Sequence, residues 1–154
     1  TKCFLANDNS KGQIILSGKN KDLNKFSLLL KQNKIKNIKL PVSAPFHCEL
    51  MKNATIQMDR VINSQKFQNP KIKVISNVSA SEYKNEEEIK KLLIKQIESP
   101  VRWRESINYM ISQGTTSFVE IGPGKVLSGL IKRINKDVKV LNIDTLEDIQ
   151  GINL

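Results

Sequence analysis

The sequence predicts an α/β fold, in which helices cover a parallel sheet and a small α+β lobe comes first. Two patterns in the 154 residues support this fold. Up to residue 40 the chain reads as strand, strand, helix and strand, which is typical of a small α+β unit. After residue 41, short apolar runs alternate with segments whose apolar residues recur three and four apart, as in parallel sheets covered on both faces. We therefore divide the chain into residues 1–40 and residues 41–154.

The elements of the lobe are predicted from apolar runs and from turn residues. The residues from Asp8 to Gly12 have turn chemistry and separate two short apolar runs. A helix follows, capped by Asn20 or Asp22, because its apolar residues lie on one face. The expected elements are strands at 3–7, 13–17 and 35–40 and a helix that ends near Asn33.

The larger part is predicted in the same way. Three consecutive glutamates, Glu86 to Glu88, suit the first turn of a helix, where the helix dipole favours acidic residues. Pro100 suits the first turn of the next helix. The expected strands lie at 73–78, 116–121 and 138–143, and the expected helices run to Ser64, to Ile97, to Gly114 and to Ile134, with a short turn or helix from Thr145.

The composition limits the functions that this chain can have. Its net charge of +10 is the balance of 25 basic and 15 acidic residues, and only four of the basic residues are arginines. Nucleic-acid sites favour clustered arginine with stacking aromatics, so we rank a solvated surface first, an acidic partner or phosphate ligand second and nucleic acid third.

The cysteines and the apolar runs indicate no metal site and no membrane span. Cys3 and Cys48 form no CxxC pair, and with a single histidine they cannot complete a four-ligand zinc site. No apolar run approaches the roughly 20 residues that cross a bilayer. We expect a cytoplasmic protein and, because the chain does not begin with Met, a piece of something longer.

His47 is the only histidine and the best general acid or base that the chain offers. Prolines at 41 and 45 end an extended run and a helical pattern starts at Cys48, so His47 lies at a strand-to-helix corner. Such corners are where α/β proteins place their chemistry. A histidine without a partner in the sequence also fits a helix cap or a polar gap in the core.

Other motifs leave alternatives open. Gly122-Pro123-Gly124 lies between a predicted strand and a helix, where anions bind, but it has neither Walker nor dinucleotide spacing. A tight turn beside a crowded site explains these glycines equally well. Gln96 either orients a site group or is an ordinary exposed residue, and residues 7–9 could be only a turn.

Four motifs in order resemble one family. They are Asn7-x-Asn9 with Gly12 to Gly18, Leu40-Pro41-Val42-Ser43-Ala44-Pro45-Phe46-His47-x-x-Leu50-Met51, Gln96-x-x-x-Pro100-Val101-x-Trp103, and Glu120 to Leu130. In these motifs the whole chain resembles the C-terminal portion of the malonyl-CoA:acyl-carrier-protein transacylases of bacterial fatty-acid synthesis. The resemblance implies an α/β-hydrolase-like parallel sheet portion and a small ferredoxin-like α+β lobe, incomplete at the N-terminus.

The resemblance also implies a reaction and its residues. The family moves malonate from malonyl-CoA to the phosphopantetheine thiol of acyl carrier protein through a serine ester, without a further cofactor. His47 would be the base, held by a backbone carbonyl at the position of Gln96. Asn9 would face the acyl pocket, Phe46 would exclude a methyl branch, and Gly122, Pro123 and Gly124 would line the site as backbone.

Parts of the family's active site have no counterpart in these residues. The Gly-x-Ser-x-Gly nucleophile, the oxyanion-hole glutamine and the malonyl-binding arginine precede the matching segment. We therefore expect the isolated chain to be inactive, to expose a sheet edge and an apolar face, and to work only with an N-terminal half that carries the nucleophile. The alternative is a non-catalytic basic α/β module that binds an acidic protein or a phosphate ligand.

Overall fold

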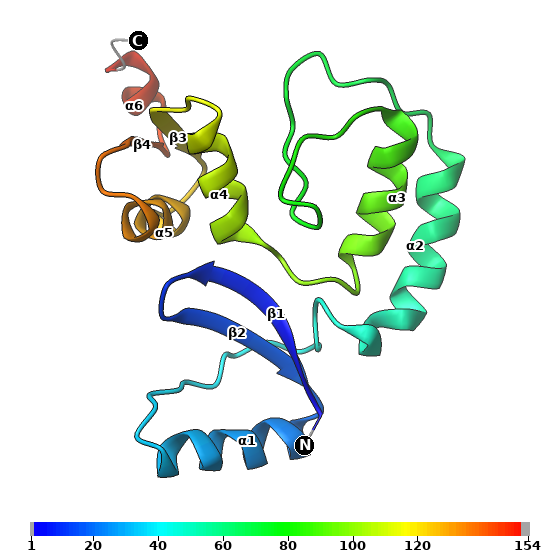
Figure 1. Cartoon of the computed structure of the whole chain (residues 1–154). Helices are drawn as coiled ribbons and strands as arrows, with labels where there is room; N and C mark the ends of the chain where they lie inside the picture. The colour runs from blue at the N-terminus through cyan, green and yellow to red at the C-terminus, as the bar shows by residue number, and fades with distance from the viewer. Residues whose placement is uncertain (1, 152–154) are drawn as a thin grey trace.

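The computed structural model describes residues 2–151, and its first part is a β-hairpin with one helix packed on it (Figure 1). Strand β1 (Cys3–Ser10) pairs antiparallel with β2 (Gln13–Gly18), and helix α1 (Asn20–Gln32) follows, close to the predicted bounds. The predicted turn over residues 8–12 is too long, because β1 continues through Ser10. The turn is confined to Lys11 and Gly12, where Gly12 has a φ of 81° that glycine adopts without a side-chain clash.

The strand predicted at residues 35–40 is wrong, because these residues form a coil. Alternating apolar residues need a neighbouring strand to pair with their backbone groups, and no strand of residues 2–151 pairs with them. The coil is instead tied to α1 through Asn37, whose side chain bonds with the Ser27 hydroxyl at 2.6 Å and with the Ile35 carbonyl at 3.2 Å. Ile38 consequently remains 75% exposed.

Two helices form the next part of the fold. A short 3-10 turn (Glu49–Met51) leads into α2 (Lys52–Ser64), and α3 (Glu86–Gln96) packs beside α2. Asn85 caps α3 by accepting a hydrogen bond from the Glu88 amide at 2.9 Å, so the acidic first turn is confirmed. Among the described residues of this helix only Leu92 is buried.

The segment between α2 and α3 is a loop, so the strand predicted at 73–78 is wrong. Only Ile75 makes a ladder contact, an isolated bridge to Glu82. The chain reverses between Ser76 and Ala80, where the Ala80 amide donates to the Ser76 carbonyl at 2.9 Å. This reversal begins at the fourth residue of the predicted strand and interrupts it.

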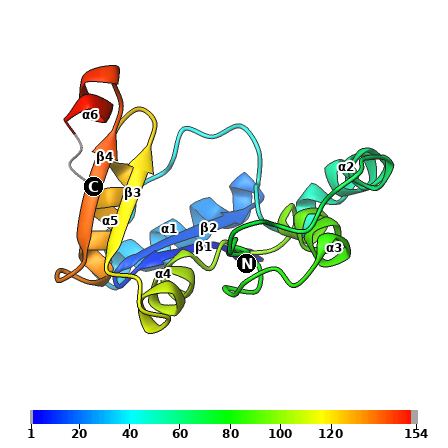
Figure 2. The same ribbon diagram turned by 90° about the horizontal axis from the view of Figure 1, so that it is seen from above.

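The remaining elements form the α/β part of the molecule. Helix α4 (Trp103–Ser112) begins three residues after Pro100, later than predicted, because Val101 pairs with β1 instead. The predicted strands are present as β3 (Ser117–Ile121) and β4 (Lys139–Ile143), which pair in parallel through the crossover helix α5 (Val126–Ile134). A short helix α6 (Leu146–Gln150) follows β4. Figure 2 shows the β1–β2 hairpin between this part and the α2–α3 pair.

The buried core lies between α4, α5 and the β3–β4 sheet. Ile107, Ile131 and Val138 are buried together, and Trp103 packs against them. The opposite face of the sheet is uncovered by residues 2–151, so the prediction of helices on both faces is wrong for this part of the chain. Its alternate residues are among the exposed apolar side chains of the molecule: Val119 (45%), Ile121 (80%) and Leu141 (46%).

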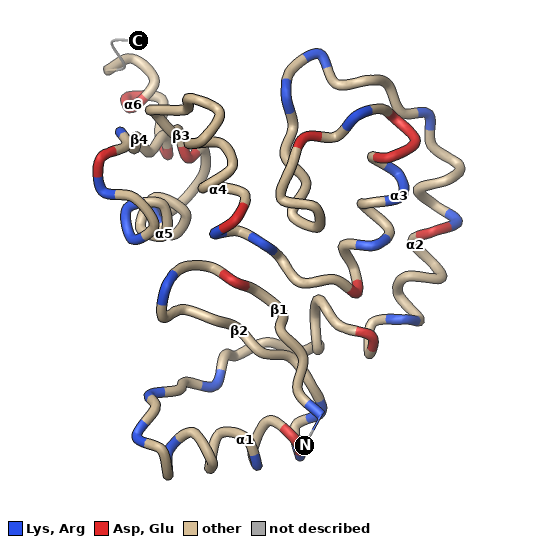
Figure 3. The backbone as a smooth tube through the Cα atoms, viewed as in Figure 1, with Lys and Arg blue, Asp and Glu red and all other residues tan. Residues whose placement is uncertain are grey.

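The charged residues show no single basic face. Lysines and arginines are spread along α1, α2, α3, α5 and the connecting loops (Figure 3). This distribution agrees with a solvated surface more than with a nucleic-acid groove.

Across residues 2–151 we find no helix with the length and apolar character needed to cross a membrane.

Candidate active site

His47 lies at the corner between the coil and the 3-10 turn that begins at Glu49. Its φ of 61° is in the left-handed region, which few residues other than glycine adopt. Such a conformation costs of order 1–3 kcal/mol and persists only where surrounding contacts hold it. The Ser17 hydroxyl donates to the Phe46 carbonyl at 2.5 Å, and the buried Cys48 thiol donates to the Pro45 carbonyl at 3.1 Å. These contacts hold the backbone on both sides of His47.

The partner of His47 is a backbone oxygen at the end of α3. The imidazole Nδ1 lies 3.1 Å from the carbonyl oxygen of Gln96, the last residue of that helix. The last carbonyls of a helix have no N–H partner within the helix and accept hydrogen bonds from elsewhere. Within the turn that follows the helix, this oxygen accepts a hydrogen bond only from the Ser99 amide, and the N–O distance of 3.4 Å is long. Gln96 is therefore placed to bind the imidazole through its main chain.

This contact selects one tautomer of the imidazole. A carbonyl oxygen only accepts hydrogen bonds, so Nδ1 carries the proton and donates it to Gln96. The Gln96 side-chain amide lies 3.4 Å from the same Nδ1 but donates to the Ser99 carbonyl at the shorter distance of 3.1 Å. With Nδ1 protonated, the Nε2 of His47 has a free electron pair that can accept a proton.

The other predicted pocket residues lie on two elements. Phe46 precedes His47 directly and is 46% exposed. Asn9 is half-buried in strand β1, so it does not belong to a turn. Among residues 2–151 we find no hydrogen bond that joins Asn9 to His47 or Gln96. The structure thus brings His47, Gln96 and Phe46 together, and the roles of Asn9 and Phe46 stay predictions.

The Gly122-Pro123-Gly124 turn is held by side chains of the α/β part. Both carboxylate oxygens of Glu120 accept hydrogen bonds from the start of α5, from the Leu127 amide at 3.0 Å and the Ser128 amide at 2.7 Å. Asn142 on β4 donates to the Gly124 carbonyl at 2.7 Å. Two of the amides at the start of α5 that could bind a phosphate are thus already bound to the protein's own carboxylate. The glycines serve the turn, since φ is 126° at Gly122 and 87° at Gly124.

Hydrogen bonds from Ser128 and from the Leu127 amide lower the pKa of Glu120. A carboxylate whose pKa is lower in the folded state stabilises the fold above its unfolded pKa, and this stabilisation disappears as the pH falls through the folded value. We expect Glu120→Gln to lower the free energy of unfolding at pH 7, and the difference from the parent chain to shrink below about pH 4.3. Urea unfolding of the variant and of the parent chain, at pH 7 and below about pH 4.3, measures this difference in the free energy of unfolding. Asp137→Asn, at an exposed loop residue, is the control and should show little change at either pH.

The sequence reasoning missed Ser17, which holds the backbone beside His47, and Glu120 and Asn142, which hold the turn of residues 122–124. An acidic residue shortly before the start of a helix is a capping signal that could have identified Glu120. Ser17 and Asn142 give no such signal, because their partners are backbone carbonyls distant in the sequence. Among residues 2–151 no three His, Cys, Asp or Glu side chains group as a metal site would need.

Comparisons with known proteins find relatives that match almost the whole of this chain. The chain is 46% identical over 147 residues to the malonyl CoA-acyl carrier protein transacylase of Bacillus subtilis, covering 95% of the chain and 46% of the relative. The acyl-carrier-protein-S-malonyltransferase of Bartonella henselae has the same fold, with a TM-score of 0.92 and 41% identity over 97% of this chain and 48% of that one. A third structure, of a type II PKS acyl-carrier protein in complex with its malonyl-transacylase, has a TM-score of 0.91 at 33% identity over 97% of this chain and 49% of that one.

The fold that the chain shares with these structures is of the α/β class. No family model matches the chain. Over the length that it spans, however, the chain is similar to malonyl-CoA:acyl-carrier-protein transacylases. The chain spans about half the length of the curated relatives that it matches.

Proposed function

We propose that this chain is the base-bearing part of a transacylase that moves a malonyl group from malonyl-CoA to the phosphopantetheine thiol of acyl carrier protein. The observation that carries the proposal is the His47–Gln96 contact of 3.1 Å, which leaves Nε2 of the only histidine as a proton acceptor. The relatives bear the name of this activity, and one solved relative is in complex with its acyl-carrier protein.

In the proposed reaction His47 moves protons for a serine on a segment outside these residues. The serine oxygen bonds to the malonyl carbonyl carbon as the carbon–sulfur bond of malonyl-CoA breaks, and Nε2 takes the serine proton and gives it to the departing thiolate. In the second half Nε2 takes the proton of the phosphopantetheine thiol, whose sulfur attacks the ester, and returns it to the serine oxygen. No further cofactor takes part.

The remaining site residues have roles in binding. Asn9 contributes to the acyl pocket, and Phe46, half-exposed beside the imidazole, limits the size of the acyl group. The turn of Gly122, Pro123 and Gly124 lines the site through its backbone, held by Glu120 and Asn142.

We further propose that a nucleophile-bearing segment completes the fold. The 154 residues contain no Gly-x-Ser-x-Gly, and the relatives are about twice as long. Large apolar patches on a protein surface mark interaction sites, and the exposed face with Val119, Ile121 and Leu141 is such a patch. The β3–β4 pair is then part of an α/β-hydrolase-like sheet in residues 41–154, and residues 1–40 are part of a ferredoxin-like subdomain.

The alternative, a non-catalytic module for a phosphate ligand or an acidic protein, has less support. Glu120 accepts hydrogen bonds from two of the amides at the start of α5 that would bind the phosphate, and its charge would repel an anion there. The basic residues are dispersed and do not form a single face (Figure 3).

A reconstitution experiment tests the proposal. The chain is mixed with a folded N-terminal segment of the family that carries the Gly-x-Ser-x-Gly serine, malonyl-CoA is added, and intact mass spectrometry records the product. We expect a malonyl adduct on the segment only when both parts are present, and transfer to acyl carrier protein when it is added. Absence of any adduct from the pair, while circular dichroism shows the segment folded, contradicts the proposal.

A further inference from the structure

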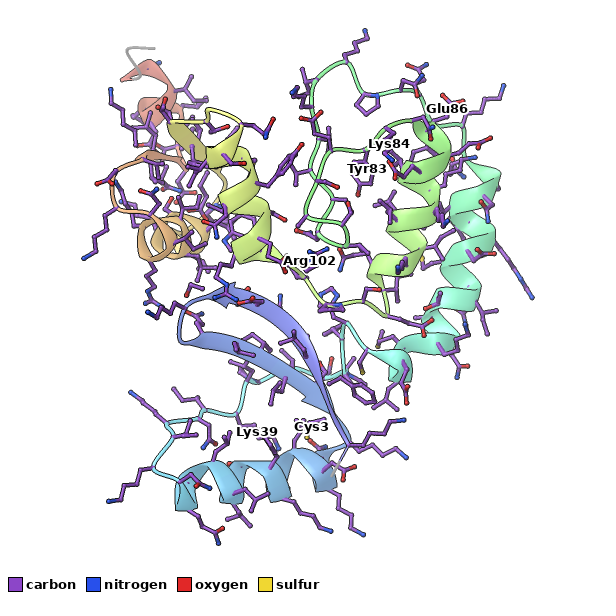
Figure 4. The ribbon with its side chains drawn as sticks, viewed as in Figure 1. Cys3, Lys39, Tyr83, Lys84, Glu86 and Arg102 are labelled. Atoms are coloured by element: carbon purple, nitrogen blue, oxygen red, sulfur yellow. The ribbon has the colours of Figure 1, made fainter. Side chains whose placement is uncertain are left out.

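Residues 101 and 102 lie where the β1 strand, the loop before α3 and helix α4 meet (Figure 4). The Val101 amide donates to the Ala6 carbonyl of β1 at 2.8 Å, and the Val101 carbonyl accepts from the Asp8 amide at 2.9 Å. The next amide, of Arg102, donates to the Asn77 carbonyl in the loop at 3.0 Å. Two consecutive residues thus fasten the small lobe to the loop that leads into α3.

The guanidinium of Arg102 strengthens the same junction. Its Nη1 donates to two loop carbonyls, of Val78 at 3.2 Å and of Ser79 at 3.0 Å. Its Nε and Nη2 donate to the carboxylate of Glu105, one turn along α4. Arginine can make all these contacts at once because its planar head presents five N–H donors in a fixed fork, which lysine cannot reproduce.

These bonds join the segment that precedes helix α3 to the segment that follows it. The bonded carbonyls of residues 77–79 precede α3 (Glu86–Gln96), and Arg102 follows it, so both flanking segments of the helix are clamped at one point. Gln96 ends α3 only six residues before Arg102, and its carbonyl holds the imidazole of His47. The position of that carbonyl therefore depends on how firmly the flanking segments are held.

We propose that Arg102 is a positioning residue for His47: its clamp on the loop carbonyls fixes the Gln96 carbonyl and thereby the Nδ1–H tautomer of the imidazole. The inference concerns the orientation of His47, and its importance for catalysis rests on the proposed function. A position error of about 1 Å far from the chemistry can lower a rate by about 10²-fold. Loss of the clamp should therefore lower malonyl transfer by up to that factor in the reconstituted pair.

Because the chain has one histidine, its tautomer can be measured without assignment problems. Long-range ¹⁵N–¹H correlation spectra of the labelled chain at pH 8 distinguish the Nδ1–H and Nε2–H forms. We expect Nδ1–H as the major form in the parent chain and a loss of its predominance in Arg102→Lys and Arg102→Met. Glu105→Gln keeps the two loop carbonyls bonded to Arg102 and should leave the tautomer as in the parent.

The matched control is Arg60→Lys, at an exposed arginine of α2, which should leave the tautomer unchanged. Folded Arg102 variants with an unchanged tautomer would overturn the proposal. So would unfolding of both variants, because Arg102 would then support the fold as a whole. The spectra do not depend on transfer activity. A failed reconstitution therefore contradicts the proposed function, whereas an unchanged tautomer in the Arg102 variants contradicts the role of Arg102.

Discussion

His47→Ala is expected to lower malonyl transfer by the reconstituted pair by about 10²–10⁴-fold, the usual contribution of a general acid or base. The physical reason is the loss of Nε2, the free proton acceptor left by the bond between Nδ1 and the Gln96 carbonyl. The rate is measured as malonylated acyl carrier protein by intact mass against time. Both half-reactions should slow, because the same nitrogen serves each of them.

The backbone conformation at residue 47 requires a control of its own. Alanine at a φ of 61° is strained, so a loss of activity could come from a shifted loop. Lys34 has a φ of 58° in the same coil and no side-chain hydrogen bond among the described residues, so Lys34→Ala introduces a comparable backbone change away from the imidazole. Transfer that survives in His47→Ala at the parent rate would exclude His47 as the base.

The structure confirms the predicted contact between His47 and the backbone carbonyl of Gln96. Only the resemblance to a family predicted that His47 contacts Gln96. The two residues are 49 positions apart, and every residue has a backbone carbonyl, so the residue type does not indicate this contact. The left-handed backbone conformation at His47 was not predicted from the sequence either. Histidine at that φ depends on contacts from Ser17 and Cys48, which lie on opposite sides of it in the sequence.

Elements with a fixed local signal were predicted well, and strands were predicted correctly only where a partner strand is present to pair with them. The start of helix α3 follows from its three glutamates, because the helix dipole acts within the first turn. Residues 35–40 and 73–78 have the composition of strands, but a strand forms only beside another one. In residues 2–151 the first segment is bonded to α1 through Asn37, and the second turns back on itself at Ser76.

The largest stability loss is expected at Ile107, whose side chain is fully buried between Ile131 and Val138. Ile107→Ala should lower the free energy of unfolding by about 2–5 kcal/mol, the lost burial plus the cavity that remains. The free energy of unfolding of native domains is only about 5–15 kcal/mol in total, so this variant should be partly unfolded at a low urea concentration. The single tryptophan, Trp103, packs against the same cluster, and its fluorescence reports the transition directly.

Val126→Ala is the control for Ile107→Ala, because it removes an apolar side chain from neighbouring α5 at a position that is 71% exposed. Exposed substitutions away from special features usually change stability by about 0.5 kcal/mol or less. The two variants therefore separate the effect of burial from the effect of apolar content. A loss at Ile107 no larger than at Val126 would show that α4 does not pack on α5 and the sheet as described. The Arg102 clamp at the start of α4 would then lack the rigid support that the positioning of His47 requires.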